Sequence, residues 1–430
     1  MKSTTTHVSG VCLGIIQTTW DHVVTRFHSY IYDNPSQPIH SAVLAYRGTN
    51  YATTRASAMT RLLYLISLPC IAAKATSVFT DKEVQKCSRF RLPQLVRNNH
   101  SGAVHVLANC CGANRCSSKA WGVELDGDEE DGLGDDFSDC KVIMKTSHDE
   151  GRTWTNFQTV SPKGADHYAS GAGIYDKVRS RLVVQYQHFP YGSTKPCNST
   201  IYLQTMSSDD GATWSKTADI SPFINPGCND NRHDGDHNKV YQSAGSKVQT
   251  PTGRLVWPGK AQGGPVCVWY SDDGGATYNV SNQFKGNEVS VAYVRAYEPN
   301  ELYMNGRGQQ FPWGGTHRTE YRSHDGGTTW SSGTESQLTD GSAGQVERSL
   351  RHIGAALYAA GPMKPKRSAM RIYCSRDEGH TWPSKVDVND DRKGGYSDMV
   401  GLRSGKELLL VWEDGEGNFN AEVVDHTFCA

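Results

Sequence analysis

The sequence predicts an all-β fold built from repeated four-stranded sheets, as in a β-propeller. The 430 residues include 43 glycines, 10 tryptophans and 20 tyrosines, a mixture of turn formers and aromatic anchors that is typical of β proteins. One octapeptide pattern, S-x-D-x-G-x-T-[WY], occurs five times at intervals of 52 to 64 residues. That interval is the length of one four-stranded sheet with its loops, so the copies are expected to mark propeller blades.

Each copy of the repeat is expected to form a tight turn between two strands. Its Ser and Asp side chains can accept hydrogen bonds from backbone amides, its Gly supplies a positive φ, and its final aromatic residue packs under the hairpin. We therefore interpret the Asp residues as structural rather than as metal ligands or catalysts. Strand-like runs precede several copies, and no long amphipathic helical period is present, so helix content should be low. The copies begin at Ser147, Ser207, Ser271, Ser323 and Ser375.

Residues 59–75 have the layout of a signal peptide. Arg61 precedes an apolar run at 62–73, and small residues in an A-x-A arrangement follow. The run is too short to span a bilayer, although a buried core element is an alternative interpretation. We expect the mature chain to begin after about Ala75, with one propeller domain over 76–430. Residues 1–58 carry no assignment.

The cysteines suggest an exported protein with disulfides. The chain has 12 cysteines without the paired CxxC spacing of a zinc site. If Cys12 and Cys70 fall outside the mature chain, ten remain, an even number that can pair. Vicinal Cys110 and Cys111 are not expected to bond to each other, because the ring would be strained. N-glycosylation sequons that agree with export stand at Asn99, Asn198 and Asn279.

The charge balance excludes several classes of partner. The formal net charge is −1, so there is no basic field to hold a nucleic acid and no acidic excess typical of disordered chains. We expect no cofactor, no metal, no nucleic acid and no membrane span, and we expect a monomer.

The repeat is the Asp box, and with it the chain resembles the sialidases (neuraminidases) of the six-bladed propeller fold. Asp boxes also occur in other propellers, including other carbohydrate-cleaving enzymes and non-catalytic receptor domains, so the box alone indicates fold better than function. The resemblance spans about residues 77–430. Six blades over the predicted mature chain give about 59 residues each, in keeping with the repeat interval.

The resemblance implies three arginines that bind the substrate carboxylate. Arg91 lies in the strand motif FRLP, which SVFT precedes as the family's first strand would. Arg307 closes the run LYMNGR. Arg367 stands eight residues before Ser375 of the last Asp box, the family's usual offset; Arg371 is a competitor at a different offset.

The resemblance also implies a nucleophile and two glutamates. Tyr396, in GGYSDMVGL, matches the family's nucleophilic tyrosine, and Glu413, in LLLVWED, matches the glutamate that braces the first arginine. Glu288, 19 residues before the second arginine, matches the glutamate that activates the tyrosine. Glu298 and Glu301 are alternatives for that last role.

The acid/base aspartate implied by the resemblance is Asp136, in DDFSDC. It lies eleven residues before the first Asp-box serine, and Asp135 is an alternative. This aspartate would protonate the leaving oxygen and then deprotonate the incoming water, which gives net retention at the anomeric carbon.

These residue types also form a coherent site on chemical grounds. Sialic acid carries a carboxylate on its anomeric carbon, and arginine forks donate paired charge-assisted hydrogen bonds to such a group. That carboxylate would repel a carboxylate nucleophile, whereas a neutral phenol, with a pKa near ~10, can attack if a glutamate assists its deprotonation. A tyrosine nucleophile is a known exception to the two-carboxylate rule of glycosidases and comes here from the resemblance.

The function implied is that of a secreted or lumenal exo-α-sialidase that acts on sialylated glycans. One alternative is a trans-sialidase, and the sequence does not separate the two. A second is a non-catalytic sialoglycan-binding propeller, which would be expected to lack the tyrosine or an arginine. A third, a glycosidase of neutral polysaccharides, would need two facing carboxylates and no arginine clamp.

Overall fold

A computed structural model describes the chain in two units, Met1–Ala72 and Ala73–Ala430. In the first unit, β1 (Cys12–Gly14) pairs antiparallel with β2 (Ile66–Leu68). The predicted signal peptide and residues 1–58 lie almost entirely outside the described residues and stay predictions. The described residues are 12–14, 66–68, 75–84, 86–87, 89–115, 138–163, 167–189, 201–228, 240–261, 265–308, 311–312, 317–339, 346–388 and 393–429.

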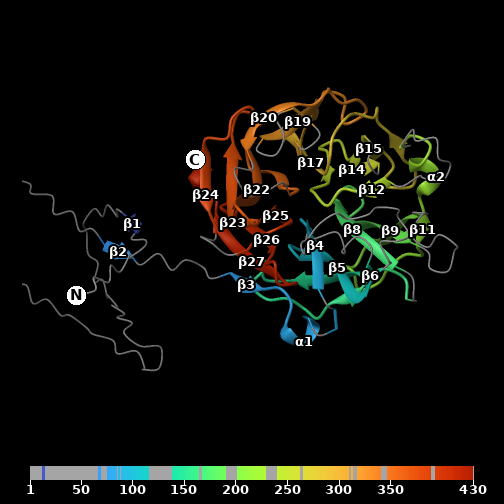
Figure 1. The fold of residues 1–430 in the computed structure, drawn as a ribbon, viewed down its shortest axis with the longest axis horizontal. Coiled ribbons are helices and arrows are strands. Elements are labelled where there is room, and N and C mark those ends of the chain that lie inside the picture. Colours follow the sequence, from blue (N-terminus) through green and yellow to red (C-terminus); the bar gives the residue numbers. More distant parts are fainter. Residues whose placement is uncertain are drawn as a thin grey trace, which may run out of the picture. The chain divides into compact units, whose positions relative to one another are not determined.

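The described strands of the second unit form six antiparallel sheets around one axis, which confirms the predicted six-bladed propeller (Figure 1). In each blade the first strand is innermost. The first blade contains β4 (Arg89–Arg97), β5 (Val104–Arg115), β6 (Ser138–Ser147) and β7 (Gln158–Thr159). The second contains β8 (His167–Asp176), β9 (Arg181–Phe189), β10 (Ile201–Ser207) and β11 (Ala218–Asp219). The third contains β12 (Val240–Gln242), β13 (Val248–Gln249), β14 (Leu255–Ala261), β15 (Val266–Ser271) and β16 (Asn279–Val280).

The remaining blades follow the same order. The fourth blade contains β17 (Val289–Arg295), β18 (Glu298–Gly306), β19 (His317–Ser323) and β20 (Thr334–Thr339). The fifth contains β21 (Ser349–Ile353), β22 (Ala356–Lys364), β23 (Ser368–Ser375) and β24 (Ser384–Asp387). The sixth contains β25 (Ser397–Gly401), β26 (Glu407–Glu413), β27 (Phe419–Asp425) and β3 (Thr76–Ser77). The described helices are short, as expected: α1 (Asp81–Val84), α2 (Ser221–Ile224) and the 3₁₀ helix η3 (Thr427–Cys429).

The ring is closed by strand β3, which comes from the beginning of the propeller and pairs with β27 near its end. Ser77 lies opposite Asn420, and the amide of Val78 donates to the carbonyl of Phe419 at 2.9 Å. Because β3 supplies the outer strand of the sixth blade, that blade has no turn from its third to its fourth strand. This explains why five Asp boxes serve six blades.

The hydrophobic core lies between neighbouring blades. Each of the six described clusters of buried residues takes its members from two adjacent blades. At the closure point, for example, Phe79 stacks on Phe90 of the first blade while Phe419 of the sixth blade contacts both rings edge-on. Burial of apolar surface between blades therefore holds the ring together and fixes the positions of the loops that it carries.

The Asp boxes form the turns between the third and fourth strands, and their Asp residues are structural, as predicted. In the first box the Ser147 hydroxyl accepts from the amide of Gly151 at 2.7 Å, and Asp149 accepts from the amide and hydroxyl of Thr153 at 2.8 and 2.6 Å. Gly151 has a φ of +89°, which suits glycine. The same bonds recur in the other four boxes.

Four disulfides join described cysteines. Neighbouring Cys110 and Cys111 on β5 point to opposite faces of the strand, so they bond to different partners, as expected. Cys116 and Cys197 lie outside the described residues. The disulfides are Cys87–Cys110, Cys111–Cys140, Cys228–Cys267 and Cys374–Cys429. Among the helices that the structure describes, none is long and apolar enough to cross a membrane.

Removing one Asp-box carboxylate should destabilise the propeller. Asp325 accepts from the hydroxyl of Ser323 at 2.8 Å and from the amide and hydroxyl of Thr329 at 2.9 and 2.6 Å. Asp325→Ala should lower the free energy of unfolding by about 1–3 kcal/mol, because the turn loses these acceptors. Urea denaturation measures the change, with exposed Glu416→Ala as the control. Equal midpoints for both variants would contradict a structural role.

Candidate active site

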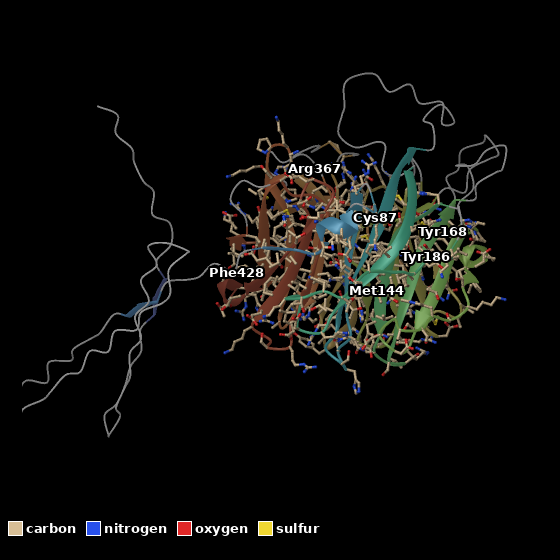
Figure 2. All side chains as sticks on the ribbon, turned by 90° about the horizontal axis from the view of Figure 1, so that it is seen from below. Cys87, Met144, Tyr168, Tyr186, Arg367 and Phe428 are labelled. Carbon is tan, nitrogen blue, oxygen red and sulfur yellow. A yellow bond between two sulfur atoms is a disulfide. The ribbon has the colours of Figure 1, made fainter. Side chains whose placement is uncertain are left out.

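The predicted site residues that the structure describes gather at one face of the propeller, where the innermost strands begin. Glu288 directly precedes β17, Tyr396 directly precedes β25, and Arg91 is the third residue of β4. Strands alternate in direction within a blade, so the Asp-box turns lie at the other face. In the side view of Figure 2, Arg367 lies near the upper edge of the ring, and Met144, three residues before an Asp box, lies farther down.

Glu288 and Arg307 meet because they flank one hairpin. Val289 of β17 pairs with Gly306 of β18, which brings the residues on either side together despite their separation of 19 in sequence. The Arg307 guanidinium donates to Oε2 of Glu288 at 2.7 Å, and its amide donates to the Glu288 carbonyl at 3.2 Å. Glu288 has a φ of +26°, a strained value for a non-glycine residue, as is often found at functional sites.

The second oxygen of Glu288 accepts a hydrogen bond from Tyr396. The phenol hydroxyl donates to Oε1 at 3.0 Å, from a residue 108 positions away on the sixth blade. One carboxylate therefore links an arginine and a tyrosine that come from different blades. This is the geometry of a base positioned to take the phenol proton.

Glu413 holds Arg91 and the backbone around Tyr396. Its Oε1 accepts from Nε of Arg91 at 2.7 Å and from the amide of Leu92 at 2.9 Å, and its Oε2 accepts from the amide of Tyr396 at 3.4 Å. A bulge in β4, where Leu92 has a φ of +56°, turns the arginine toward this carboxylate. The Arg91 guanidinium lies 5.7 Å from the centroid of the Tyr396 ring.

Arg367 lies in the turn between β22 and β23, and its backbone is tied to the loop that carries the tyrosine. The amide of Gly394 donates to the Arg367 carbonyl at 2.6 Å, two residues before Tyr396. Arg367 has a φ of +52° and Lys366 a φ of +59°, and these two residues form a tight hairpin turn. Arg367 is half-buried.

The alternative residues lie in other ion pairs. Arg371 pairs with Asp387 on the neighbouring strand β24. Glu298 accepts from Arg295 at 2.9 Å, and Glu301 lies 2.6 Å from Nδ1 of His324. These contacts favour Arg367 and Glu288 over their competitors.

The aspartate assignment falls outside the described residues. Asp136 and its alternative Asp135 belong to the segment between β5 and β6, which the structure does not describe. The disulfide Cys111–Cys140 joins the two strands that flank this segment. Cys111 of this disulfide lies opposite Arg89 of β4, two residues before Arg91.

Two carboxyl groups near the tyrosine are driven toward different protonation states. Burial raises the pKa of Glu288, but the positive charges of Arg307 and Lys260 and the Tyr396 hydroxyl outweigh it, so the pKa lies below its ordinary value. Glu347 is buried, and burial together with the charge of Glu288 raises its pKa to about 8. Glu288 is therefore the ionised member of the pair at neutral pH.

Two supporting groups were not predicted. Lys260 donates to the Asn287 side chain at 2.7 Å, next to Glu288, and Glu347 accepts from the hydroxyl of Ser243 at 2.7 Å. Lys260 lies on strand β14 of the third blade, and Glu347 lies two residues before β21 of the fifth blade. No local pattern in one sequence marks such residues, since their relation to Glu288 depends on how the blades pack.

Gly395 is required beside Glu413. A Cβ at this position would lie 2.6 Å from Oε2 of Glu413, so Gly395→Ala should displace the carboxylate that holds Arg91. The expected cost in free energy of unfolding is about 1–3 kcal/mol, measured by chemical denaturation. In a Glu413→Ala background the added cost should shrink, because the displaced group is gone. An unchanged cost in that background would refute the proposed conflict.

Comparisons with known proteins agree with this architecture. A model of the BNR repeat-like domain family matches residues 129–406. A search of curated proteins gave no significant match. Among solved structures, the Hadza microbial sialidase Hz136 is similar with a TM-score of 0.64 and 18% identity, over 86% of this chain and 72% of that chain.

Two further structures share the fold. The intramolecular trans-sialidase from Ruminococcus gnavus has a TM-score of 0.64 and 14% identity, over 84% of this chain and 99% of that chain. The Trypanosoma rangeli sialidase, described with 2,3-difluorosialic acid as a covalent intermediate, has a TM-score of 0.56 and 18% identity, over 78% of this chain and 54% of that chain. The chain therefore belongs to the BNR repeat-like family, and its fold is the six-bladed propeller of the sialidases.

Proposed function

We propose that the protein is an exo-α-sialidase that removes terminal sialic acid from glycans with retention. The observation that carries this proposal is the hydrogen bond from the Tyr396 hydroxyl to Glu288, at 3.0 Å, with Arg307 on the other oxygen of the same carboxylate. A phenol beside an ionised carboxylate and two arginines suits a nucleophile for an anionic sugar, whose carboxylate would repel an anionic attacker.

In the proposed reaction Arg91, Arg307 and Arg367 bind the substrate carboxylate. Two of these guanidiniums are held by glutamates at 2.7 Å, which supports a preorganised clamp that loses little side-chain freedom on binding. The clamp would direct the anomeric carbon toward the tyrosine.

The proposed covalent steps use Tyr396, Glu288 and Asp136. The Tyr396 oxygen attacks the anomeric carbon as its proton moves to Glu288, and the bond to the leaving oxygen breaks as Asp136 gives that oxygen its proton. Asp136 then removes a proton from water, whose oxygen bonds to the anomeric carbon and displaces the Tyr396 oxygen. The Tyr396 oxygen takes its proton back from Glu288, and the sugar is freed. Two inversions at one carbon give net retention.

Replacing the nucleophile tests the proposal. Tyr396→Phe should reduce release of the fluorophore from a fluorogenic sialoside about 10³-fold or more, because the attacking oxygen is absent. Arg367→Ala should also abolish turnover at working substrate concentrations, through loss of carboxylate binding. Tyr297→Phe, at a tyrosine that is 76% exposed, is the matched control and should keep wild-type activity.

Undiminished turnover in Tyr396→Phe would reject the nucleophile assignment. No turnover in the wild type, with retained binding of the sialoside, would instead favour a non-catalytic sialoglycan-binding propeller.

A trans-sialidase is the second candidate, since the fold similarity includes an intramolecular trans-sialidase. The two activities differ in the group that accepts the sugar. Product analysis in the presence of a galactoside acceptor separates them: free sialic acid indicates hydrolysis, and a sialylated acceptor or an internally cyclised sugar indicates transfer.

We also propose that residues 59–75 are a signal peptide and that the protein is exported. The four disulfides support an oxidising compartment, and β3 begins at Thr76, directly after the predicted cleavage region. N-terminal sequencing of secreted protein should give a start near Thr76. A start upstream of Met59 would contradict the assignment.

A further inference from the structure

A pocket of about 320 Å³ lies at the end of the propeller axis opposite the site of Glu288 and Tyr396. It is lined by residues near the ends of the innermost strands of all six blades, β4, β8, β13, β17, β21 and β25. Arg91, Glu288 and Tyr396 lie at the beginnings of these strands. We call this cavity the lower pocket; its volume is at the small end of ligand pockets, which run from about 300 to 1,000 Å³.

A buried polar layer separates the lower pocket from the active site. Asp398, fully buried on β25, accepts from the amide of Leu95 at 2.9 Å, from the hydroxyl of Ser246 at 3.0 Å and from Arg351 at 2.5 Å. The ammonium group of Lys247, also buried, donates to the side chain of Gln94 at 2.9 Å. The charges of this layer are thus satisfied within the layer.

Two further cations, Arg97 and Lys177, line the lower pocket. Among the described residues, neither Arg97 nor Lys177 forms an ion pair, Nε of Arg97 is buried without a hydrogen-bond partner, and no acidic residue lines the cavity. Burial lowers the pKa of Lys177, and the charge of Arg97 lowers it further. A half-buried arginine with an unpaired Nε, beside a second cation at the same cavity, favours binding of an anion.

Two acids near these cations are engaged by other groups. The negative charge of Glu150 acts on Arg97, but its carboxylate accepts from the amide of Arg403 at 2.8 Å. Asp176 is fully buried and directly precedes Lys177, but its carboxylate accepts from Arg179 at 3.2 Å and from the side chain of Gln249 at 2.8 Å. The positive charge at the lower pocket therefore remains available to a ligand.

The remaining residues that line the lower pocket suit an organic molecule rather than an inorganic ion. The rings of Tyr293 and His352 lie 4.6 Å apart, and Tyr175, Val248 and Ile353 also line the cavity. Burial lowers the pKa of His352, which favours its neutral form at neutral pH. Aromatic and aliphatic groups beside a few charged groups are the usual composition of a small-molecule site.

We propose that the lower pocket is a second ligand site, which binds a small organic anion of about monosaccharide size. The carboxylate or phosphate of the ligand lies between Arg97 and Lys177, and its ring packs on the wall of Tyr293 and His352. This site does not depend on the activity proposed for Tyr396.

Isothermal titration of the full chain at low salt tests this site, with glucuronic acid and glucose 6-phosphate as probes and glucose as the neutral control. At least one of the two anions should bind the wild type, and glucose should not; comparison of the two identifies the preferred anionic group. Arg97→Gln with Lys177→Gln should weaken binding at least about tenfold, through loss of charged hydrogen bonds. The pair Arg97→Lys and Lys177→Arg should retain it.

Arg307→Ala distinguishes the two sites, because it removes a cation from the active site and leaves the lower pocket intact. Binding should persist in this variant. Thermal unfolding checks that the double variant is folded; if it is not, Lys177→Gln alone, at an exposed position, should still weaken binding. The proposal is overturned if neither anion binds the wild type, if the glutamine variants bind like wild type, or if Arg307→Ala abolishes binding.

Discussion

Closure of the ring by β3 is the constraint on which the candidate site depends. The pairing of β3 with β27 places the first blade against the sixth, and only then does Arg91 meet Glu413, 322 residues away. The same contact between blades brings the backbone of Tyr396 to Glu413. A site assembled from both ends of the chain forms only when the whole propeller has folded. Its geometry is therefore as rigid as the packing between blades, which buries aromatic and aliphatic side chains at every blade interface.

Within that frame, two glutamates organise the site by different means. Glu413 accepts from the backbone of Leu92 and Tyr396 as well as from Arg91, so it fixes positions. Glu288 is shared between Arg307 and the Tyr396 hydroxyl, so it can change its hydrogen bonding when a proton moves. Burial and the charge of Glu288 raise the pKa of the neighbouring Glu347 to about 8. Glu347 therefore adds no second negative charge at neutral pH. On the proposed function, the arginine clamp keeps its net positive charge in this way.

The fold could be predicted from the sequence because it leaves local patterns, whereas the candidate site residues came from the family resemblance. The Asp box has a fixed hydrogen-bonding pattern, and its interval reports the blade length; Glu288 and Arg307 flank one hairpin, so their spacing in sequence reflects a contact. Lys260, Glu347 and the lower pocket were not predictable, because they depend on side chains from separate blades that meet only at the axis. The absence of a sixth box also had no explanation until β3 was seen to complete the last blade. The roles of the candidate site residues, Asp136 among them, stay proposals.

The central claim is that Tyr396 becomes covalently bonded to the sugar, and trapping tests it most directly. A 2,3-difluorosialic acid is the compound in the covalent-intermediate structure of the Trypanosoma rangeli sialidase. Incubation of this protein with that compound, followed by proteolysis and mass spectrometry, should yield one labelled peptide with the sugar on Tyr396, and no label in Tyr396→Phe. Stoichiometric labelling of any other residue, or turnover of a sialoside by a wild-type enzyme that never acquires the label, would contradict the account.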